Sequence, residues 1–126
     1  LFSVAIFQNQ IFPRKHSLVP KGIEEQMASS FARRIRELTG RGPQKCKVTV
    51  MSPKVTLYTL VGFFSDGDKQ MAEMNETNID YVEKIAEHNI TEALLFLYQD
   101  REKEINNVIP IFDIRKDVVI IVVLFN

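Results

Sequence analysis

The residues with the clearest chemical potential are basic side chains gathered between positions 33 and 54. Guanidinium and ammonium groups bind phosphates and carboxylates, and arginine does so with two parallel hydrogen bonds. Glu37 is the single acid in this stretch. The pattern predicts either a surface for an anion or acidic partner, or a solvated face of no special function. The candidate ligand-binding residues are Arg33, Arg34, Arg36, Arg41, Lys45 and Lys47, with Lys54 beyond them.

The rest of the chain balances this charge, because the net charge of the 126 residues is zero. Twelve acids lie between positions 66 and 113, against four basic residues. Such polarity can bind an anion, steer a partner or join two copies in opposite orientation. A nucleic-acid-binding domain usually has a net basic stripe, with interleaved aromatics where it binds single strands. Only Tyr58 lies near the basic residues, so we do not expect nucleic-acid binding.

The motif Gly40-Arg41-Gly42-Pro43 resembles a phosphate-binding loop in composition but not in context. Phosphate loops follow a strand and open a helix, whereas this one follows a predicted helix and precedes a predicted strand. Pro43 and the β-rich segment after it also exclude the helix–GxxG–helix arrangement of KH RNA-binding modules. We interpret the motif as a helix stop and strand start.

Other side chains offer no catalytic or metal-binding pattern. The chain has two histidines, His16 and His88, and the pair His88/Glu92 is short of the three or four ligands of a usual metal site. There is no G-x-S-x-G motif, and Cys46 is expected to be a small buried hydrophobic residue on a strand. The sequence therefore predicts no enzyme, cofactor or metal. A single cysteine fits a reducing compartment, so we expect a cytoplasmic protein.

The elements that position the basic residues follow from hydrophobic spacing. Apolar residues at Ile23, Met27, Phe31, Ile35 and Leu38 predict a helix that Gly40 ends. Alternation across 44–50 predicts a half-buried strand with Lys45 and Lys47 on the face opposite Cys46. The segment 55–64 is apolar on both faces, which predicts an interior strand.

The second half predicts helices followed by a hairpin. Ser65-Asp66-Gly67-Asp68 is typical of a helix start, and Asn75 to Asn78 of an interruption or a new cap. Met71 and Met74 are expected to fill the core. A long helix against the sheet is marked by Ile79, Val82, Ile85, Ala86, Ala93, Leu94 and Leu97. The segments 108–114 and 118–125 flank a short polar turn, as in a β-hairpin.

These elements predict an α+β two-layer sandwich, with a mainly antiparallel sheet of four to five strands and two main helices on one face. Residues 1–22 are expected to form an extended arm or linker, and residues 23–126 a single domain. No basic segment or cleavage pattern of a signal peptide precedes or follows the apolar residues 1–7. Helices cover only one face of such a sheet, so its two-sided apolar strands need another cover: the segment 1–7, a second copy of the protein or a partner. We expect a homodimer, with exchange of the arm as one form of it.

The run Leu38-Thr39-Gly40-Arg41-Gly42-Pro43, followed by Lys47-Val48-Thr49-Val50, resembles the MpsC-like family. These are bacterial domains of poorly defined biochemistry, named after a sodium-translocating, membrane-potential-generating system. The resemblance covers about Glu24 to Phe125 and continues through Asp68-Lys69-Gln70-Met71-Ala72 to Asp113-Ile114. It implies a cytoplasmic accessory or regulatory domain, associated with a membrane system that transports ions or bicarbonate. It carries over no catalytic residues.

Taken together, the sequence predicts a non-enzymatic protein-interaction domain, dimeric and without a transmembrane segment. A membrane transport-system protein is the partner that the resemblance implies. The alternative is a small-anion or nucleotide sensor that uses the basic residues between 33 and 47.

Overall fold

The computed structural model describes residues 19–126, apart from the side chain of residue 102. These described residues form three α-helices, a short 3-10 helix and four strands, which confirms the predicted α+β class. Most of the predicted N-terminal arm lies outside the described residues, and the first helix begins two residues before position 23. The elements are α2 (Lys21–Thr39), β1 (Lys45–Ser52), β2 (Val55–Val61), α3 (Asp66–Met74), α4 (Glu76–Leu97), η3 (Gln99–Glu104), β3 (Ile105–Asp113) and β4 (Val118–Phe125).

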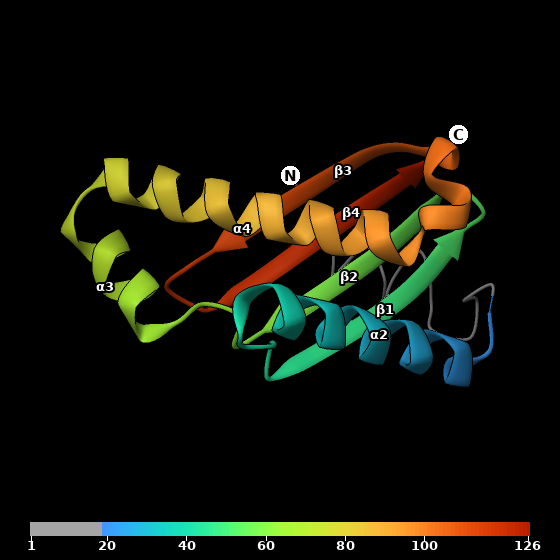
Figure 1. Cartoon of the computed structure of the whole chain (residues 1–126), viewed down its shortest axis with the longest axis horizontal. Helices are drawn as coiled ribbons and strands as arrows, with labels where there is room; N and C mark the ends of the chain where they lie inside the picture. Colours follow the sequence, from blue (N-terminus) through green and yellow to red (C-terminus); the bar gives the residue numbers. More distant parts are fainter. Residues whose placement is uncertain (1–18) are drawn as a thin grey trace.

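The strands form one antiparallel sheet in the order β1-β2-β4-β3 (Figure 1). Two hairpins, β1–β2 and β3–β4, meet along β2 and β4, where Tyr58 lies opposite Ile121. Strand β2 is thus interior, as its two apolar faces predicted. The edges of the sheet are β1 and β3.

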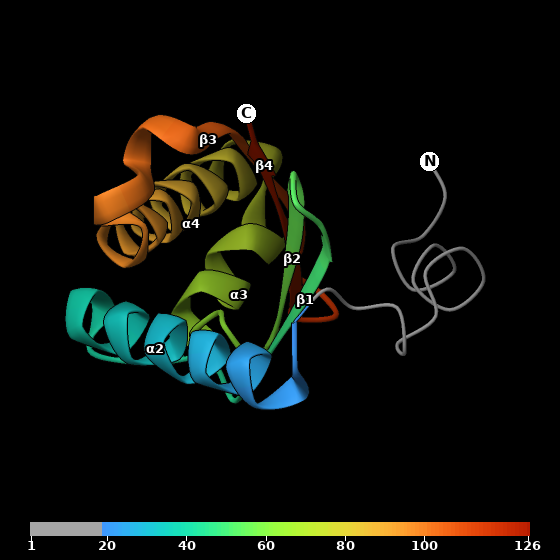
Figure 2. The same ribbon diagram turned by 90° about the vertical axis from the view of Figure 1, so that its right-hand side faces the viewer.

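All three helices lie on one side of the sheet, as Figure 2 shows. The two long helices, α2 and α4, pack against each other and cover the strands, with α2 beside β1. The shorter α3 packs on the N-terminal part of α4. We call the sheet surface beneath the helices the inner face, and the opposite surface the outer face.

Local sequence sets the helix ends. Gly40 ends α2 with a left-handed φ of 82°, and its N–H donates to the carbonyl of Arg36. Ser65 begins α3 with a capping box: its hydroxyl accepts from the N–H of Asp68, and the Asp68 carboxylate accepts from the N–H of Ser65. Asn75 then caps α4 by accepting from the N–H of Asn78. These ends confirm the stop and the start signals in the sequence.

The core lies between the inner face and the two long helices. Its largest fully buried side chains are Phe31 and Ile35 from α2, Tyr58 and Leu60 from β2, Phe64 from the segment after β2, Ile90 and Leu94 from α4, and Val119, Ile121 and Val123 from β4. The Tyr58 hydroxyl has a partner inside this core, since it lies 2.8 Å from the hydroxyl of Tyr98. Buried polar groups need such partners, because an unpaired one costs about 1–3 kcal/mol.

Several predicted core positions are wrong. Met74 is 74% exposed at the end of α3, whereas Met71 does pack against the core. Ile23, Leu38 and Ile85 are also exposed. The reason in α2 is rotation: the buried positions are Glu24, Ala28, Phe31 and Ile35, so the inward stripe is shifted from the apolar stripe at both helix ends.

Candidate interaction site

The outer face of β2, β4 and β3 is mostly apolar, and Thr59 is a polar position on the β2 part of it. In one row of the sheet, Leu57 lies opposite Val122, which lies opposite Ile109, and in the next row Ile120 lies opposite Ile111. These positions alternate with the buried core residues, so their side chains point away from the helices. The apolar outer-face residues are Val55, Leu57 and Val61 of β2, Ile109 and Ile111 of β3, and Val118, Ile120, Val122 and Leu124 of β4.

The exposure of this face rises toward β3. Ile109 is 39% exposed and Ile111 is 40% exposed, whereas Leu57 in the middle of the sheet is buried. A contiguous apolar patch on a sheet is uncommon on a monomer and marks an interaction surface. The helices of residues 19–126 thus cover one face of the sheet only, as the sequence predicted.

Charges border the outer face on opposite sides. Lys45 begins the row that continues through Val61 and Val118 to Asp113. Lys47 lies on the same strand face as Lys45, and all three charged side chains are exposed. One edge of the apolar patch is therefore positive and the other has a negative corner.

The β3 edge is closed to further strands. The N–H of Val108 donates to the side-chain oxygen of Asn107, at 2.9 Å, instead of to β4. The outward-facing backbone groups of an edge strand alternate, so Pro110 occupies the next outward position, where it has no N–H. Proline and a local irregularity between Ile105 and Asn107 protect this edge from pairing.

The β1 edge is different. The N–H of Val50 donates to the Glu24 carboxylate at 2.9 Å, so it points outward from the sheet. The same alternation makes the N–H groups of Cys46 and Val48 point outward. No residue within 19–126 accepts a hydrogen bond from these two groups. Val48 is only 2% exposed, so the backbone of this edge is largely covered.

The six predicted ligand-binding residues do not form one site, because the fold directs them to four places. Lys45 and Lys47 lie on the outer face of the sheet. Arg33 and Arg36 line a hollow of about 600 Å³ between α2 and the start of β1. Of the six, these two pairs are the only ones that the fold keeps together.

Arg34 and Arg41 are already occupied. The Arg34 guanidinium lies 4.0 Å from the centre of the Phe96 ring on α4, and one of its nitrogens lies 3.7 Å from the Glu37 carboxylate. The Arg41 guanidinium donates to the carbonyl of Gly62 at 3.4 Å. Both side chains hold elements together, and this role was not visible in the sequence.

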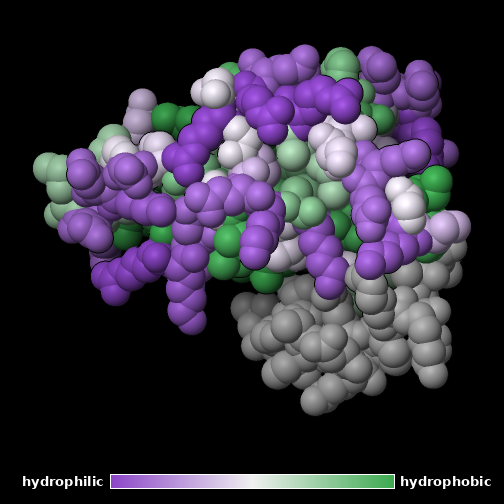
Figure 3. All heavy atoms as spheres, turned by 90° about the horizontal axis from the view of Figure 1, so that it is seen from below, coloured by the Kyte–Doolittle hydropathy of each residue, from purple (hydrophilic) through white to green (hydrophobic). Residues whose placement is uncertain are grey.

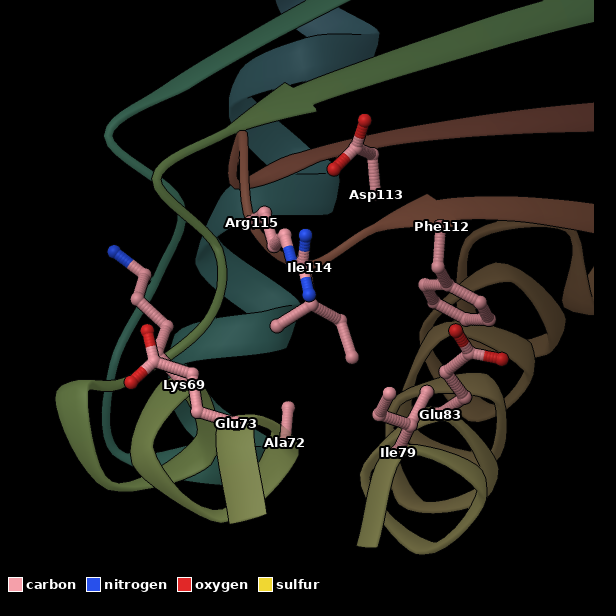
Figure 4. A pocket seen from close by; sticks show the side chains of 9 residues that line it. All are labelled: Lys69, Ala72, Glu73, Ile79, Glu83, Phe112, Asp113, Ile114 and Arg115. Atoms are coloured by element: carbon pink, nitrogen blue, oxygen red, sulfur yellow. The ribbon is translucent and has the colours of Figure 1, made fainter. Parts of the chain in front are cut away.

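A second hollow, of about 410 Å³, lies between α3, the start of α4 and the end of the β3–β4 hairpin (Figure 4). Ala72, Ile79, Phe112 and Ile114 supply apolar walls. Its charged residues have both signs, and the Lys69 ammonium is paired with Asp117 at 2.9 Å. The pKa of Glu83 is raised, mainly because the carboxyl is partly buried and secondly because the Asp80 carboxylate lies nearby. The charged groups do not point toward a common centre. This hollow therefore suits an apolar side chain better than a charged ligand.

Asp117, at the turn between β3 and β4, is a structural residue that the sequence did not single out. One oxygen of its carboxylate accepts from the N–H groups of Phe63 and Phe64, both at 2.9 Å, and the other binds Lys69. Burial alone would raise the pKa of Asp117, but the bonds from Phe64, Lys69 and Phe63 outweigh it and hold the pKa below its usual value. The sequence offered one signal for this role, namely an aspartate that follows Arg115 and Lys116 in the predicted turn.

The chemistry of the remaining polar residues is limited. Burial raises the pKa of the Cys46 thiol to about 12, so the thiol stays protonated and a poor nucleophile. Within residues 19–126, no three or more of the histidine, cysteine and acidic side chains gather closely enough to hold a metal ion. No helix in that range has both the length and the apolar composition needed to cross a bilayer.

Comparison with known proteins adds no relative to this picture. No family model matches the chain, and neither a curated protein nor a solved structure matches it.

Proposed function

We propose that this protein is a non-enzymatic association domain that forms a homodimer through the outer face of its sheet. The observation that carries the proposal is the apolar outer-face pairs Val122 with Ile109 and Ile120 with Ile111, which no helix within residues 19–126 covers. Two such faces pack as the halves of a β-sandwich, about 10 Å apart, with strands aligned to within about 30°. The second copy is the natural occupant, because its face is apolar to the same extent.

Charge at the borders selects one arrangement of the two copies. A two-fold axis parallel to the strands places β1 of one subunit over β3 of its partner. Lys45 then lies near Asp113 of the partner subunit, because the two residues belong to the same row of the sheet. An axis perpendicular to the strands would instead place β1 over β1 and bring lysines together. Complementary charges fix the register of an interface more than they add affinity.

The resemblance to MpsC-like domains suggests what such a dimer serves. A dimer of this kind would act as an accessory part of a membrane system that transports ions or bicarbonate, on the cytoplasmic side. Support for this part of the proposal comes from the sequence resemblance alone.

Anion sensing is the second candidate function. The observation that favours it is the hollow shared by Arg33, Arg36 and Gln44. A small anion bound there would raise the melting temperature of the protein, and phosphate, bicarbonate and nucleotides are the probes for a thermal-shift measurement.

The dimer is tested by a pair of matched substitutions. Ile111→Lys places a charge in the outer face. Ile85→Lys makes the same change on α4, at a position of similar exposure: Ile85 is 45% exposed and Ile111 is 40% exposed. We expect Ile111→Lys to weaken dimerisation about 100-fold or more in sedimentation equilibrium, since a buried unpaired charge costs several kcal/mol. Ile85→Lys should leave the dimer intact. Equal effects of the two variants, or none from either, would rule out the outer face as the interface.

A further inference from the structure

A hollow of about 260 Å³ lies between the N-terminal half of α2 and the C-terminal end of α4, which lie side by side (Figure 1). Ile23, Met27 and Leu97 supply apolar walls, and Tyr58 and Tyr98 also line it. None of its lining residues is charged, in contrast to the hollows at α3 and at the start of β1. Long hydrophilic side chains cover much of the α2 side of the molecule, as Figure 3 shows, so an uncharged hollow beside this helix is a local exception. We call it the tyrosine hollow.

Two buried hydroxyl groups meet at the tyrosine hollow. The hydroxyls of Tyr58 and Tyr98 lie 2.8 Å apart, and the two residues are only 1% and 9% exposed. Tyr58 belongs to the sheet beneath, so the tip of its side chain is the part that reaches the helix layer. The rings are fixed from the side, because Tyr58 packs on Phe31 at 4.9 Å between ring centres and Tyr98 packs on Phe125 at 5.3 Å. The hydroxyl pair is therefore held in place before any ligand binds.

One of the two hydroxyl protons has no acceptor in the described part of the chain. Burial raises the pKa of both tyrosines, so both hydroxyls keep their protons at neutral pH. Whichever hydroxyl donates to the other, the second one still has a proton of its own to donate. No residue within 19–126 accepts that proton. A buried donor without a partner is costly, so the hollow favours a molecule that brings an acceptor.

We propose that the tyrosine hollow binds a small neutral molecule with an apolar ring and a carbonyl oxygen, and that this oxygen accepts the remaining hydroxyl proton of Tyr58 and Tyr98. The ring displaces water from the apolar walls, which is favourable. A charged ligand would lose its hydration and meet no opposite charge in the lining.

The size of the hollow limits the ligand to about one ring with a short substituent. An apolar cavity of about 150 Å³ holds one benzene molecule. The tyrosine hollow, at about 260 Å³, therefore has room for a ring and a small carbonyl group.

This inference goes beyond the dimer and does not depend on it. The tyrosine hollow lies in the helix layer, whereas the proposed interface is the outer face of the sheet. The Ile111→Lys variant is expected to bind the small molecule as the unchanged protein does. Failure of one proposal is thus visible while the other still holds.

The test uses the full chain and three probes in NMR titrations of the backbone amides. Acetophenone has an apolar ring and a carbonyl oxygen, toluene has the ring without an acceptor, and benzoate matches acetophenone in size but is charged. We expect acetophenone to bind about three- to tenfold more tightly than toluene, the gain from one net hydrogen bond. Benzoate should bind about tenfold or more weakly than acetophenone. Equal binding of acetophenone and toluene, or tighter binding of benzoate, overturns the proposal.

The amides that shift locate the bound probe. Shift changes should centre on Gln26, Ser30 and Leu97, which line the tyrosine hollow, and should spare Ala72 and Ile114 at the α3 hollow. Changes centred on the α3 hollow overturn the proposal. So does a lack of saturation up to about 10 mM acetophenone, which would show that the tyrosine hollow holds only water or a segment of the chain itself.

A double substitution then removes the two hydroxyls and leaves both rings. Tyr58→Phe combined with Tyr98→Phe takes away donor and acceptor together, a change that is nearly neutral for stability because no buried polar group is left unpaired. Acetophenone should bind this variant about three- to tenfold more weakly. Toluene binding should change less than about twofold, which also shows that the variant is folded.

Tyr81→Phe is the matched control, since Tyr81 is the exposed tyrosine of α4 and does not line the hollow. It should change acetophenone binding less than about twofold. A double variant that binds acetophenone as tightly as the unchanged protein, or a control that weakens it equally, overturns the proposal.

Discussion

At the scale of single residues, Asp117 holds together parts of the chain that are far apart in sequence. Its carboxylate accepts two N–H groups from the segment after β2 and binds Lys69 of α3, and its side chain is only 13% exposed. Its backbone φ of 54° is left-handed, a conformation that aspartate and asparagine tolerate better than other non-glycine residues. One side chain thus fixes the β3–β4 turn against the start of α3.

Asp117→Asn tests this role, since asparagine keeps the shape and the tolerance of a left-handed φ but removes the charge. We expect the free energy of unfolding to fall by about 1–2 kcal/mol at pH 7 in urea titrations, because charge-assisted hydrogen bonds become neutral ones. Asp80→Asn, an exposed change on α4, should cost less than about 0.5 kcal/mol.

The effect of Asp117→Asn should depend on pH. The pKa of Asp117 is lowered in the folded protein. Its stabilising contribution is therefore complete above the unfolded value of about 3.9 and is lost as pH falls through the lower folded value. The difference between the two proteins should shrink as the pH falls below about 3.9. A constant difference from pH 7 into that acid range would contradict the ionic role of Asp117.

At the scale of elements, Gly62 allows β2 to end where β1 begins. Its φ is 71°, and an added Cβ would lie 2.5 Å from the Cγ of Gln44. The Gly62 carbonyl also accepts from the N–H of Gln44 and from the Arg41 guanidinium. The close approach of these segments requires a residue without a side chain.

Gly62→Ala should therefore destabilise the protein by about 2–4 kcal/mol, from the left-handed backbone and from the contact with Gln44. The double variant with Gln44→Ala should regain the stability lost through the contact with Gln44. The remaining loss, about 1–2 kcal/mol, should be that of the left-handed backbone. Thermal unfolding of the single and double variants measures both parts. A single variant within about 0.5 kcal/mol of the unchanged protein would contradict this explanation.

Spacing and turn residues in the sequence were enough to predict most elements. Gly40 marked the end of α2, Ser65 the start of α3 and Asn75 a new helix, because each signal acts within a few residues. The strand order was beyond local pattern, since the pairing of β2 with β4 joins segments about 60 residues apart.

The candidate site was harder to predict than the elements. The basic residues are neighbours in sequence, but helix geometry turns Arg34 toward Phe96 on α4 while Arg33 and Arg36 line the hollow between α2 and the start of β1. Strand alternation then sends Lys45 and Lys47 to the outer face. The sequence showed that the charge is concentrated here, but how the basic side chains are divided among four places depends on how α2 and β1 pack.

At the scale of the whole molecule, the acidic and the basic residues lie on different layers. The acidic exposed positions of α4, such as Asp80 and Glu87, lie in the helix layer, away from Lys45 and Lys47 on the outer face. A dimer through the outer face thus does not join the acidic helix to the basic strand. It leaves the hollow between α2 and the start of β1, and the hollow at α3, accessible in both subunits.

The molar mass in solution tests the central claim most directly. At tens of micromolar protein, light scattering coupled to size exclusion should give twice the chain mass of 14.5 kDa. The mass should not rise further with concentration, because a two-fold interface is closed and the β3 edge is blocked by Pro110. A mass of 14.5 kDa at that concentration would show that the outer face is not a dimer interface.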